Sequence, residues 1–137
     1  MDIYAENILE HYRHPRGTAP LEDATVEHRE MNLSCGDELT LRLKLHGGIL
    51  EGLSWNGTGC AISQAGMSLL SEELAGKSTE EAQAIGKKEI HELLGVPVGP
   101  RRMKCALLCL HTLKNALRKA EGLPPQGWLD TVELADE

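Results

Sequence analysis

The sequence has no phenylalanine, and only two tryptophans and two tyrosines stand among its 137 residues. Its core must therefore be built from aliphatic side chains, of which leucine is the most frequent. A chain of this length buries roughly two-thirds of its unfolded surface as one domain and needs no disulfide bond to hold a core. We therefore predict a single domain over residues 1–137.

Basic residues and long apolar runs are also scarce. Lys and Arg number 14 against 21 Asp and Glu, a formal net charge of −7, which argues against nucleic acid as a partner. No apolar run approaches the roughly 18 residues that a membrane-spanning helix needs, which argues against a membrane as partner. Residues 1–6 carry acids where a secretory signal carries Lys or Arg. We expect a cytoplasmic protein with reduced thiols.

Alternation of apolar and polar residues predicts a β-hairpin. Over residues 39–46 leucines alternate with polar side chains, as in a half-buried strand. Two glycines at 47–48 indicate a two-residue turn. The return strand over 49–55 is expected to place Ile49, Leu53 and Trp55 on one face. Residues 24–33 have weaker β character and provide the third expected strand.

Helical spacing predicts helices on both sides of these strands. Apolar residues recur at three- and four-residue steps over 3–12 and over 62–74, and again over 103–117, where an apolar stripe is clearest. Ser78 and Glu81 form the pattern of a capping box, which predicts a helix running to about Leu94. Residues 95–100 contain two prolines and are expected to form a loop. The order of elements predicts an α+β fold with an antiparallel sheet.

Three of the four cysteines stand at expected boundaries between these elements. Cys35 lies in a turn, whereas Cys60 and Cys105 stand at or just before helix starts, where unpaired N–H groups favour thiolate. Asp37 follows Cys35 by two residues, and nearby glycines permit close backbone approach. There is no C-x-x-C pair. Three thiolates and one carboxylate brought together by folding would make a four-ligand site for zinc or iron.

Four motifs resemble those of one known family. They are ILEHYRHPRG at 8–17, CGD at 35–37, GTGCAIS at 57–63 and RMKCAL at 102–107. They are similar, in this order, to the motifs of the U-type iron–sulfur cluster assembly proteins, the IscU/SufU/NifU-like family, over residues 1 to about 120. The resemblance implies a SufE/NifU-like α+β fold with a three-stranded antiparallel sheet and packed helices. It also implies sulfur from a cysteine desulfurase and a [2Fe–2S] cluster delivered to apo iron–sulfur proteins.

The resemblance assigns roles to individual residues. Cys35, Asp37, Cys60 and Cys105 become ligands of zinc at rest or of a transient [2Fe–2S] cluster containing iron. Cys105 is also the candidate persulfide acceptor, and we expect Lys104 to assist it by lowering its pKa or by pairing with Asp37. Oxygen is a poorer match to iron than thiolate, which suits a scaffold that gives its cluster away. Such scaffolds dimerise when a cluster is shared.

The chain mixes features of two branches of the family. Lys104 stands where the IscU-like branch often has histidine, and the LPPVK stretch of that branch is missing. Yet the insertion that the SufU-like branch carries between its second and third cysteines is also missing. A scaffold, rather than an enzyme, is the main prediction. A zinc-dependent sulfurtransferase and a structural-zinc interaction domain remain as alternatives.

The remaining cysteine and the histidines match no ligand position. Cys109 is expected to pack in the core, with a spare thiol for oxidation or sulfur relay as the alternative. His11 is expected to pack from the first helix. His28, His46, His91 and His111 are interpreted as surface or capping residues.

Overall fold

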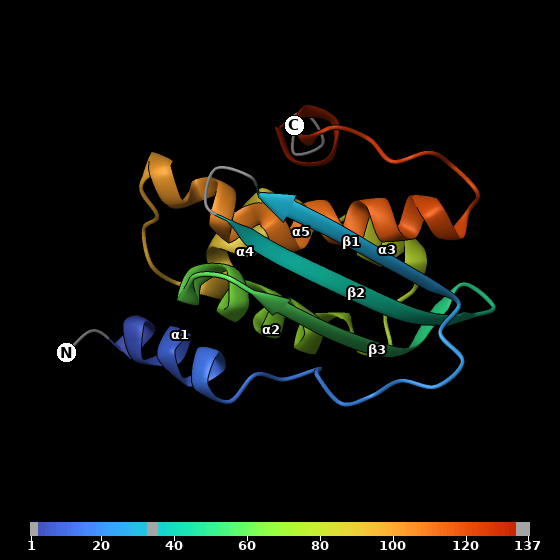
Figure 1. The fold of residues 1–137 in the computed structure, drawn as a ribbon, viewed down its shortest axis with the longest axis horizontal. Coiled ribbons are helices and arrows are strands. Elements are labelled where there is room, and N and C mark those ends of the chain that lie inside the picture. The colour runs from blue at the N-terminus through green and yellow to red at the C-terminus, as the bar shows by residue number, and fades with distance from the viewer. Residues whose placement is uncertain (1–2, 33–35, 134–137) are drawn as a thin grey trace.

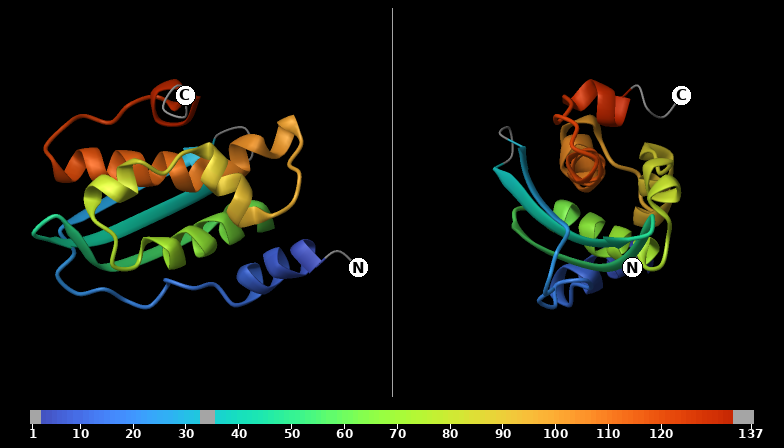
Figure 2. Two further views of the ribbon diagram at one scale, coloured as in Figure 1. Left: turned by 180° about the vertical axis from the view of Figure 1, so that it is seen from behind. Right: turned by 90° about the vertical axis from the view of Figure 1, so that its right-hand side faces the viewer.

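The computed structural model describes residues 3–32 and 36–133 (Figure 1). Three antiparallel strands form one sheet in the order β1-β2-β3, with β1 at Val26–Asn32, β2 at Asp37–His46 and β3 at Ile49–Thr58. Helices α2 (Ala61–Leu74) and α5 (Pro100–Ala120) lie within the curve of this sheet (Figure 2). The predicted α+β class is confirmed, together with its three-stranded antiparallel sheet.

The row of side chains on the inner face of β2 explains where the core begins and ends. Leu39, Leu41 and Leu43 alternate along the strand and are wholly buried, and Asp37 continues the same row at its first residue. The pairing register sets Asp37 opposite Asn32, the last residue of β1. Because side chains two residues apart share a face of a strand, the Asp37 side chain lies on the core-facing side of the sheet, at the start of β2.

The hairpin turn forms at the two predicted glycines, with φ of +58° at Gly47 and +77° at Gly48. Beyond it the expected strand faces were wrong at Ile49 and Leu50. Leu45 pairs with Leu50 but Lys44 pairs with Gly52, so the extra residue in β3 reverses the alternation there. Leu50 is therefore buried, whereas Ile49 is exposed.

The helices follow the predicted order, with two corrections. The predicted helix ending at Leu94 is two helices, α3 at Thr79–Gln83 and α4 at Lys87–Leu94. Gly86, which is a poor helix former, has extended backbone between them and begins α4 as its N-cap. The loop expected over 95–100 ends one residue early, because Pro100 is the first residue of α5. At that position proline removes an N–H that would have no helical partner.

The predicted capping box is confirmed at α3. The Glu81 backbone N–H donates to Ser78 Oγ at 3.0 Å, and the Ser78 N–H donates to the Glu81 carboxylate at 3.0 Å. These bonds from Ser78 hold the pKa of the Glu81 carboxyl below its usual value. A helix of five residues thus receives two hydrogen bonds at its start that its own backbone cannot supply.

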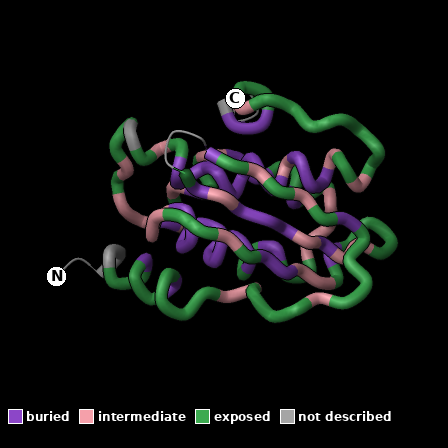
Figure 3. The backbone as a smooth tube through the Cα atoms, in the orientation of Figure 1, coloured by how far each residue is buried: buried purple, intermediate pink, exposed green. Residues whose placement is uncertain are grey.

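Aliphatic side chains from the sheet, α2, α4 and α5 form the core, as the composition predicts. Figure 3 shows the buried positions along the backbone. The stripe along α5 is confirmed, since Leu107, Leu110, Leu113 and Leu117 are buried and Met103 packs against them. None of the helices in the described ranges combines the length and apolar character that crossing a bilayer requires.

The N-terminal helix α1 (Ile3–Arg13) packs on α2. His11 is buried there, with its Nδ1 2.7 Å from Ser68 Oγ, as expected for a packing role. Ser71 Oγ and Trp55 Nε1 both donate to the Arg16 carbonyl, at 3.0 and 2.6 Å. The predicted motif at 8–17 is therefore used to dock the first helix against the body.

The surface role expected for His111 was wrong. Its ring is buried on α5, with Nδ1 2.6 Å from Thr131 Oγ1 and Nε2 3.2 Å from the Glu30 carboxylate. His28 Nε2 lies 2.6 Å from the same carboxylate. Glu30 therefore links β1 to α5, and His111 links α5 to the C-terminal π-helix Leu129–Glu133. A single histidine in an apolar stripe gave no sequence signal for these distant partners.

Candidate metal centre

The first ligand candidate, Asp37, is wholly buried although it is a carboxylate. Its Oδ1 accepts a hydrogen bond of 2.9 Å from the Cys60 backbone N–H. A buried carboxylate needs such a donor. Moving a neutral polar group out of water without a hydrogen-bond partner costs roughly 2–7 kcal/mol, and moving a charged group costs more. Asp37 thus ties the start of β2 to the start of α2.

Cys60 stands where the sequence predicted it, immediately before a helix. It is the N-cap residue of α2, with extended backbone and no side-chain capping bond. Its thiol is therefore left available beside the positive end of the helix. Ser63 Oγ donates to the Cys60 carbonyl at 3.1 Å, which holds the first turn of the helix to the residue that carries the thiol.

Cys105 is not at a helix start, contrary to the prediction. Because α5 begins at Pro100, Cys105 lies on its second turn. It is 4% exposed, so its position is set by the packing of α5 and not by a mobile loop. The partial charge of a helix terminus falls off within the first turn, and the expected dipole effect on this thiol does not apply.

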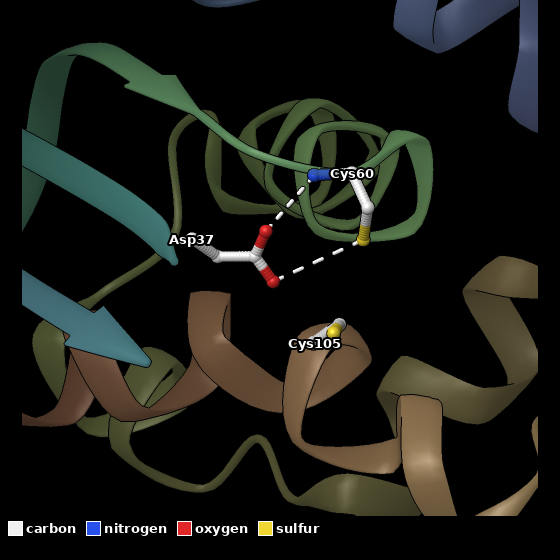
Figure 4. Close-up of side chains that lie close together, drawn as sticks. All are labelled: Asp37, Cys60 and Cys105. Atoms are coloured by element: carbon white, nitrogen blue, oxygen red, sulfur yellow. Dashed lines mark hydrogen bonds between the residues drawn. The ribbon is translucent and has the colours of Figure 1, made fainter. Parts of the chain in front are cut away.

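The structure brings these three residues together from three separate elements (Figure 4). One ligand atom from each of Asp37, Cys60 and Cys105 lies within 4.8 Å of the others. The Cys60 Sγ is 3.9 Å from Asp37 Oδ2. In a tetrahedral zinc site ligand atoms are separated by about 3.5–3.8 Å, given Zn–S of about 2.3 Å and Zn–O of about 2.0 Å. The residues present therefore fit a metal ion if the separations between their ligand atoms contract by at most about 1.3 Å.

Two further residues were predicted for the site. Cys35 lies outside the described residues. Lys104 is exposed on α5, next to Cys105 in sequence. The donor set of the described trio is two thiols and one carboxylate, a mixture that suits zinc or iron and not magnesium or calcium.

Cys109 lies in the core, as expected. It is wholly buried, its Sγ contacts the Ala106 carbonyl at 3.5 Å, and burial raises the pKa of its thiol to about 12. It faces Gly66 of α2, where an added Cβ would lie 3.5 Å from the sulfur. No disulfide joins Cys60, Cys105 or Cys109, the cysteines within the described part of the chain.

Two neighbours of the site were only weakly indicated by the sequence. Asn32 is buried and pairs with Asp37 across the sheet, a position that only the strand register reveals. Gly59 touches Asp37 closely, with φ of +142° and space for no side chain. The cluster of glycines before Cys60 was a signal of close approach, although it did not name the group approached.

Comparison with known proteins gives relatives over most of the chain. The sequence-family model described as the NifU-like N-terminal domain matches residues 3–124 of this chain. The chain is 35% identical to the iron–sulfur cluster assembly scaffold protein IscU of Thermotoga maritima, covering 85% of this chain and 94% of that protein. It is 33% identical to the zinc-dependent sulfurtransferase SufU of Bacillus subtilis, covering 88% and 92%.

Solved structures show the same fold. A protein of Fervidobacterium islandicum AW-1, described as a cluster assembly scaffold for the SUF system, superposes with a TM-score of 0.69 at 32% identity, covering 82% of this chain and 94% of that one. A NifU-like N-terminal protein of Brucella abortus has a TM-score of 0.72 at 20% identity, covering 88% and 95%, and shows the fold alone. The chain therefore belongs to the NifU-like N-terminal domain family of U-type iron–sulfur cluster assembly proteins.

Proposed function

We propose that this protein is an iron–sulfur cluster assembly scaffold. It accepts sulfur from a cysteine desulfurase, holds a nascent [2Fe–2S] cluster and passes it to apo iron–sulfur proteins in the cytoplasm. The observation that carries the proposal is the convergence of Asp37, Cys60 and Cys105, whose ligand atoms lie within 4.8 Å of one another. Kinship to proteins named as scaffolds supports it.

Cys35 completes the proposed ligand set. It precedes Asp37 by two residues, so covalent geometry alone limits the separation of their Cα atoms to about 7 Å. With Cys35 the site has three thiolates and one carboxylate. A permanently bound iron–sulfur cluster is typically held by four cysteine thiolates, so this site has one sulfur ligand fewer. The cluster is cargo, and an oxygen ligand weakens its hold. Sharing a cluster between two copies would give a dimer in the loaded state.

At rest we propose that the same four residues hold zinc. Zinc is commonly bound by four ligands of this kind, and its removal destabilises the surrounding fold. The thiols must lose their protons on binding, so zinc affinity should fall as the pH falls. Because the ligands come from the segment between β1 and β2, the first residue of β2, the N-cap of α2 and α5, bound zinc would cross-link the sheet to both central helices.

We propose Cys105 as the sulfur acceptor. Its thiolate would attack the terminal sulfur of a cysteine persulfide on the desulfurase. A new S–S bond then forms on Cys105 as the old one breaks, and the desulfurase cysteine leaves as a thiolate. Since Cys105 is 4% exposed and Cys60 is half-buried, this step requires local opening around Cys105.

Lys104 is proposed to assist sulfur transfer from outside the ligand set. Its exposed ammonium, on the residue before Cys105 in sequence, would attract the anionic persulfide and favour the thiolate form. Lys104→Ala should therefore slow persulfide formation on Cys105 while zinc content stays equal to that of the original protein. A variant that loses zinc as well would contradict this division of roles.

A second candidate function is zinc-dependent sulfur transfer without cluster assembly. Lys104 beside Cys105 favours it, and the Bacillus subtilis relative carries this description. The same four ligands would then hold zinc permanently, and Cys105 would leave the zinc to carry persulfide. The two candidates share the site and differ in their product.

Anaerobic reconstitution separates the candidates. The protein is incubated with iron, cysteine and a cysteine desulfurase, and bound iron, sulfide and zinc are then measured. A bound cluster that activates an apo-ferredoxin supports the scaffold. Retained zinc, with persulfide mapped to Cys105 and no cluster, supports the sulfur carrier. Persulfide on Cys60 alone would contradict the assignment of the acceptor.

Two cysteine variants provide the matched control. Cys60→Ser should lose tight metal binding and the thermal stabilisation that metal gives. Cys109→Ala removes a thiol from the core and should keep both. If Cys60→Ser binds zinc as the original protein does, the proposed four-ligand site is wrong.

A further inference from the structure

Gly59 occupies a position from which any side chain is excluded by Asp37 itself. A Cβ built on Gly59 would lie 2.1 Å from Asp37 Oδ1, 2.8 Å from Cγ and 3.0 Å from Cα. Its φ of +142° is also one that L side chains rarely adopt. Gly76 and Gly122 likewise have positive φ, yet a Cβ on either would meet nothing within 4 Å. Contact with a candidate ligand therefore distinguishes Gly59 from these turn glycines.

The two oxygens of Asp37 have different neighbours. Oδ1 lies against Gly59 and accepts the Cys60 backbone N–H at 2.9 Å. Oδ2 points to the Cys60 thiol, 3.9 Å away (Figure 4). Asp37 is wholly buried, so its carboxylate has little freedom to exchange the two positions.

We propose that Gly59 is the positioning residue of the metal centre. Its missing side chain reserves Oδ1 for the Cys60 amide and leaves Oδ2 as the one oxygen presented to the metal. The inference rests on the proposed metal-binding function and deepens it. Gly59 touches no metal and acts only through Asp37.

This arrangement has a consequence for the strength of the oxygen ligand. A carboxylate that already accepts an amide hydrogen bond on one oxygen binds metal through the other, with one oxygen instead of two. Outer partners that orient metal ligands typically change metal affinity by about 10–100-fold when mutated. A methyl group at position 59 would displace the carboxylate and remove the oxygen ligand while Asp37 is still present.

The test is a double-mutant cycle of Gly59→Ala and Asp37→Ala, with zinc affinity measured by competition with a chromophoric chelator. We expect Gly59→Ala to weaken zinc binding by about 10–100-fold, and to weaken it no further when Asp37 is already Ala. Gly76→Ala is the matched control, since it places alanine at positive φ without touching the site, and should leave zinc affinity unchanged. If Gly59→Ala weakens zinc binding by the same factor whether residue 37 is Asp or Ala, the proposal is overturned.

A second measurement works on the metal-free protein. The Cys60 amide is the NMR reporter, because its N–H donates to Asp37 Oδ1 and its resonance depends on that hydrogen bond. Gly59→Ala and Asp37→Ala should each shift this resonance and speed its hydrogen exchange, and Gly76→Ala should do neither. An unchanged Cys60 amide in Gly59→Ala would overturn the proposal, even if zinc binding falls. This readout requires neither zinc nor sulfur transfer, so failure of the proposed function remains distinguishable from failure of this inference.

Discussion

Cys109 should be chemically inert in the folded protein, and the expected degree of inertness can be calculated. With its pKa raised to about 12 by burial, about one Cys109 in 10⁵ is thiolate at pH 7. A model thiol with a pKa near 8.5 is about 3% thiolate at the same pH, so the difference is about 3,000-fold. Exclusion of reagent from a wholly buried sulfur slows the reaction further.

Unfolding is the remaining route to Cys109. For a free energy of unfolding of about 5 kcal/mol, about one molecule in 5,000 is open at a time. Both routes predict alkylation by iodoacetamide at least 10³-fold slower than that of a model cysteine peptide. Mass spectrometry of the metal-free, reduced protein would give the rate at each cysteine, and the protein in guanidinium provides the fully reactive control.

Rapid modification of Cys109 in the folded protein would contradict this prediction. A rate within tenfold of the model peptide, with native circular dichroism throughout, would mean that the core opens easily at α2 and α5. It would also return Cys109 to consideration as a relay for sulfur. Modification confined to the other cysteines would restrict sulfur chemistry to the metal centre.

Three further predictions concern stability. Leu41→Ala, in the centre of the sheet and wholly buried, should reduce the free energy of unfolding by about 2–5 kcal/mol in urea titrations; a loss below 1 kcal/mol would contradict the packing described. Ser78→Ala removes the N-cap of α3 and should cost about 1 kcal/mol, measured by thermal unfolding, with no effect on zinc affinity. Burial lowers the pKa of His11 and of His111, so the unfolded state binds more protons than the folded state below pH 6.5. The stability that these two neutral histidines contribute is complete above about pH 6.5 and is lost as the pH falls below it. Tm of the metal-free protein should therefore decrease from pH 7.5 to 5.5, and it should decrease less in His111→Gln. An equal decrease in the original protein and in His111→Gln would contradict the assignment to His111.

Local patterns predicted the sheet and most helices because their causes are local. The leucine alternation of β2 and the capping box at Ser78 depend on residues a few positions apart, and both form as predicted. Errors arose where a single residue changed the geometry. The extra residue in β3 exposed Ile49, and Gly86 divided one predicted helix into two.

The three predicted ligand residues that the structure describes lie together, but the sequence predicted their geometry less well. The convergence of Asp37, Cys60 and Cys105 agrees with the expected group, although Cys105 lies on the second turn of α5 and not at its start. The close contact of Gly59 with Asp37 follows from the antiparallel β2–β3 register, which pairs Glu38 with Thr58 and which the extra residue in β3 shifts by one position; the turn glycines alone did not indicate that shift. The buried link from His111 to Glu30 was not foreseen either.

Zinc-edge X-ray absorption of the zinc-loaded protein measures the number and type of its ligand atoms directly. We expect three sulfur scatterers at about 2.3 Å and one oxygen at about 2.0 Å, with the oxygen contribution changed in Asp37→Ala. Four sulfur scatterers, or a shell made mainly of oxygen and nitrogen, would contradict a centre formed by Cys35, Asp37, Cys60 and Cys105.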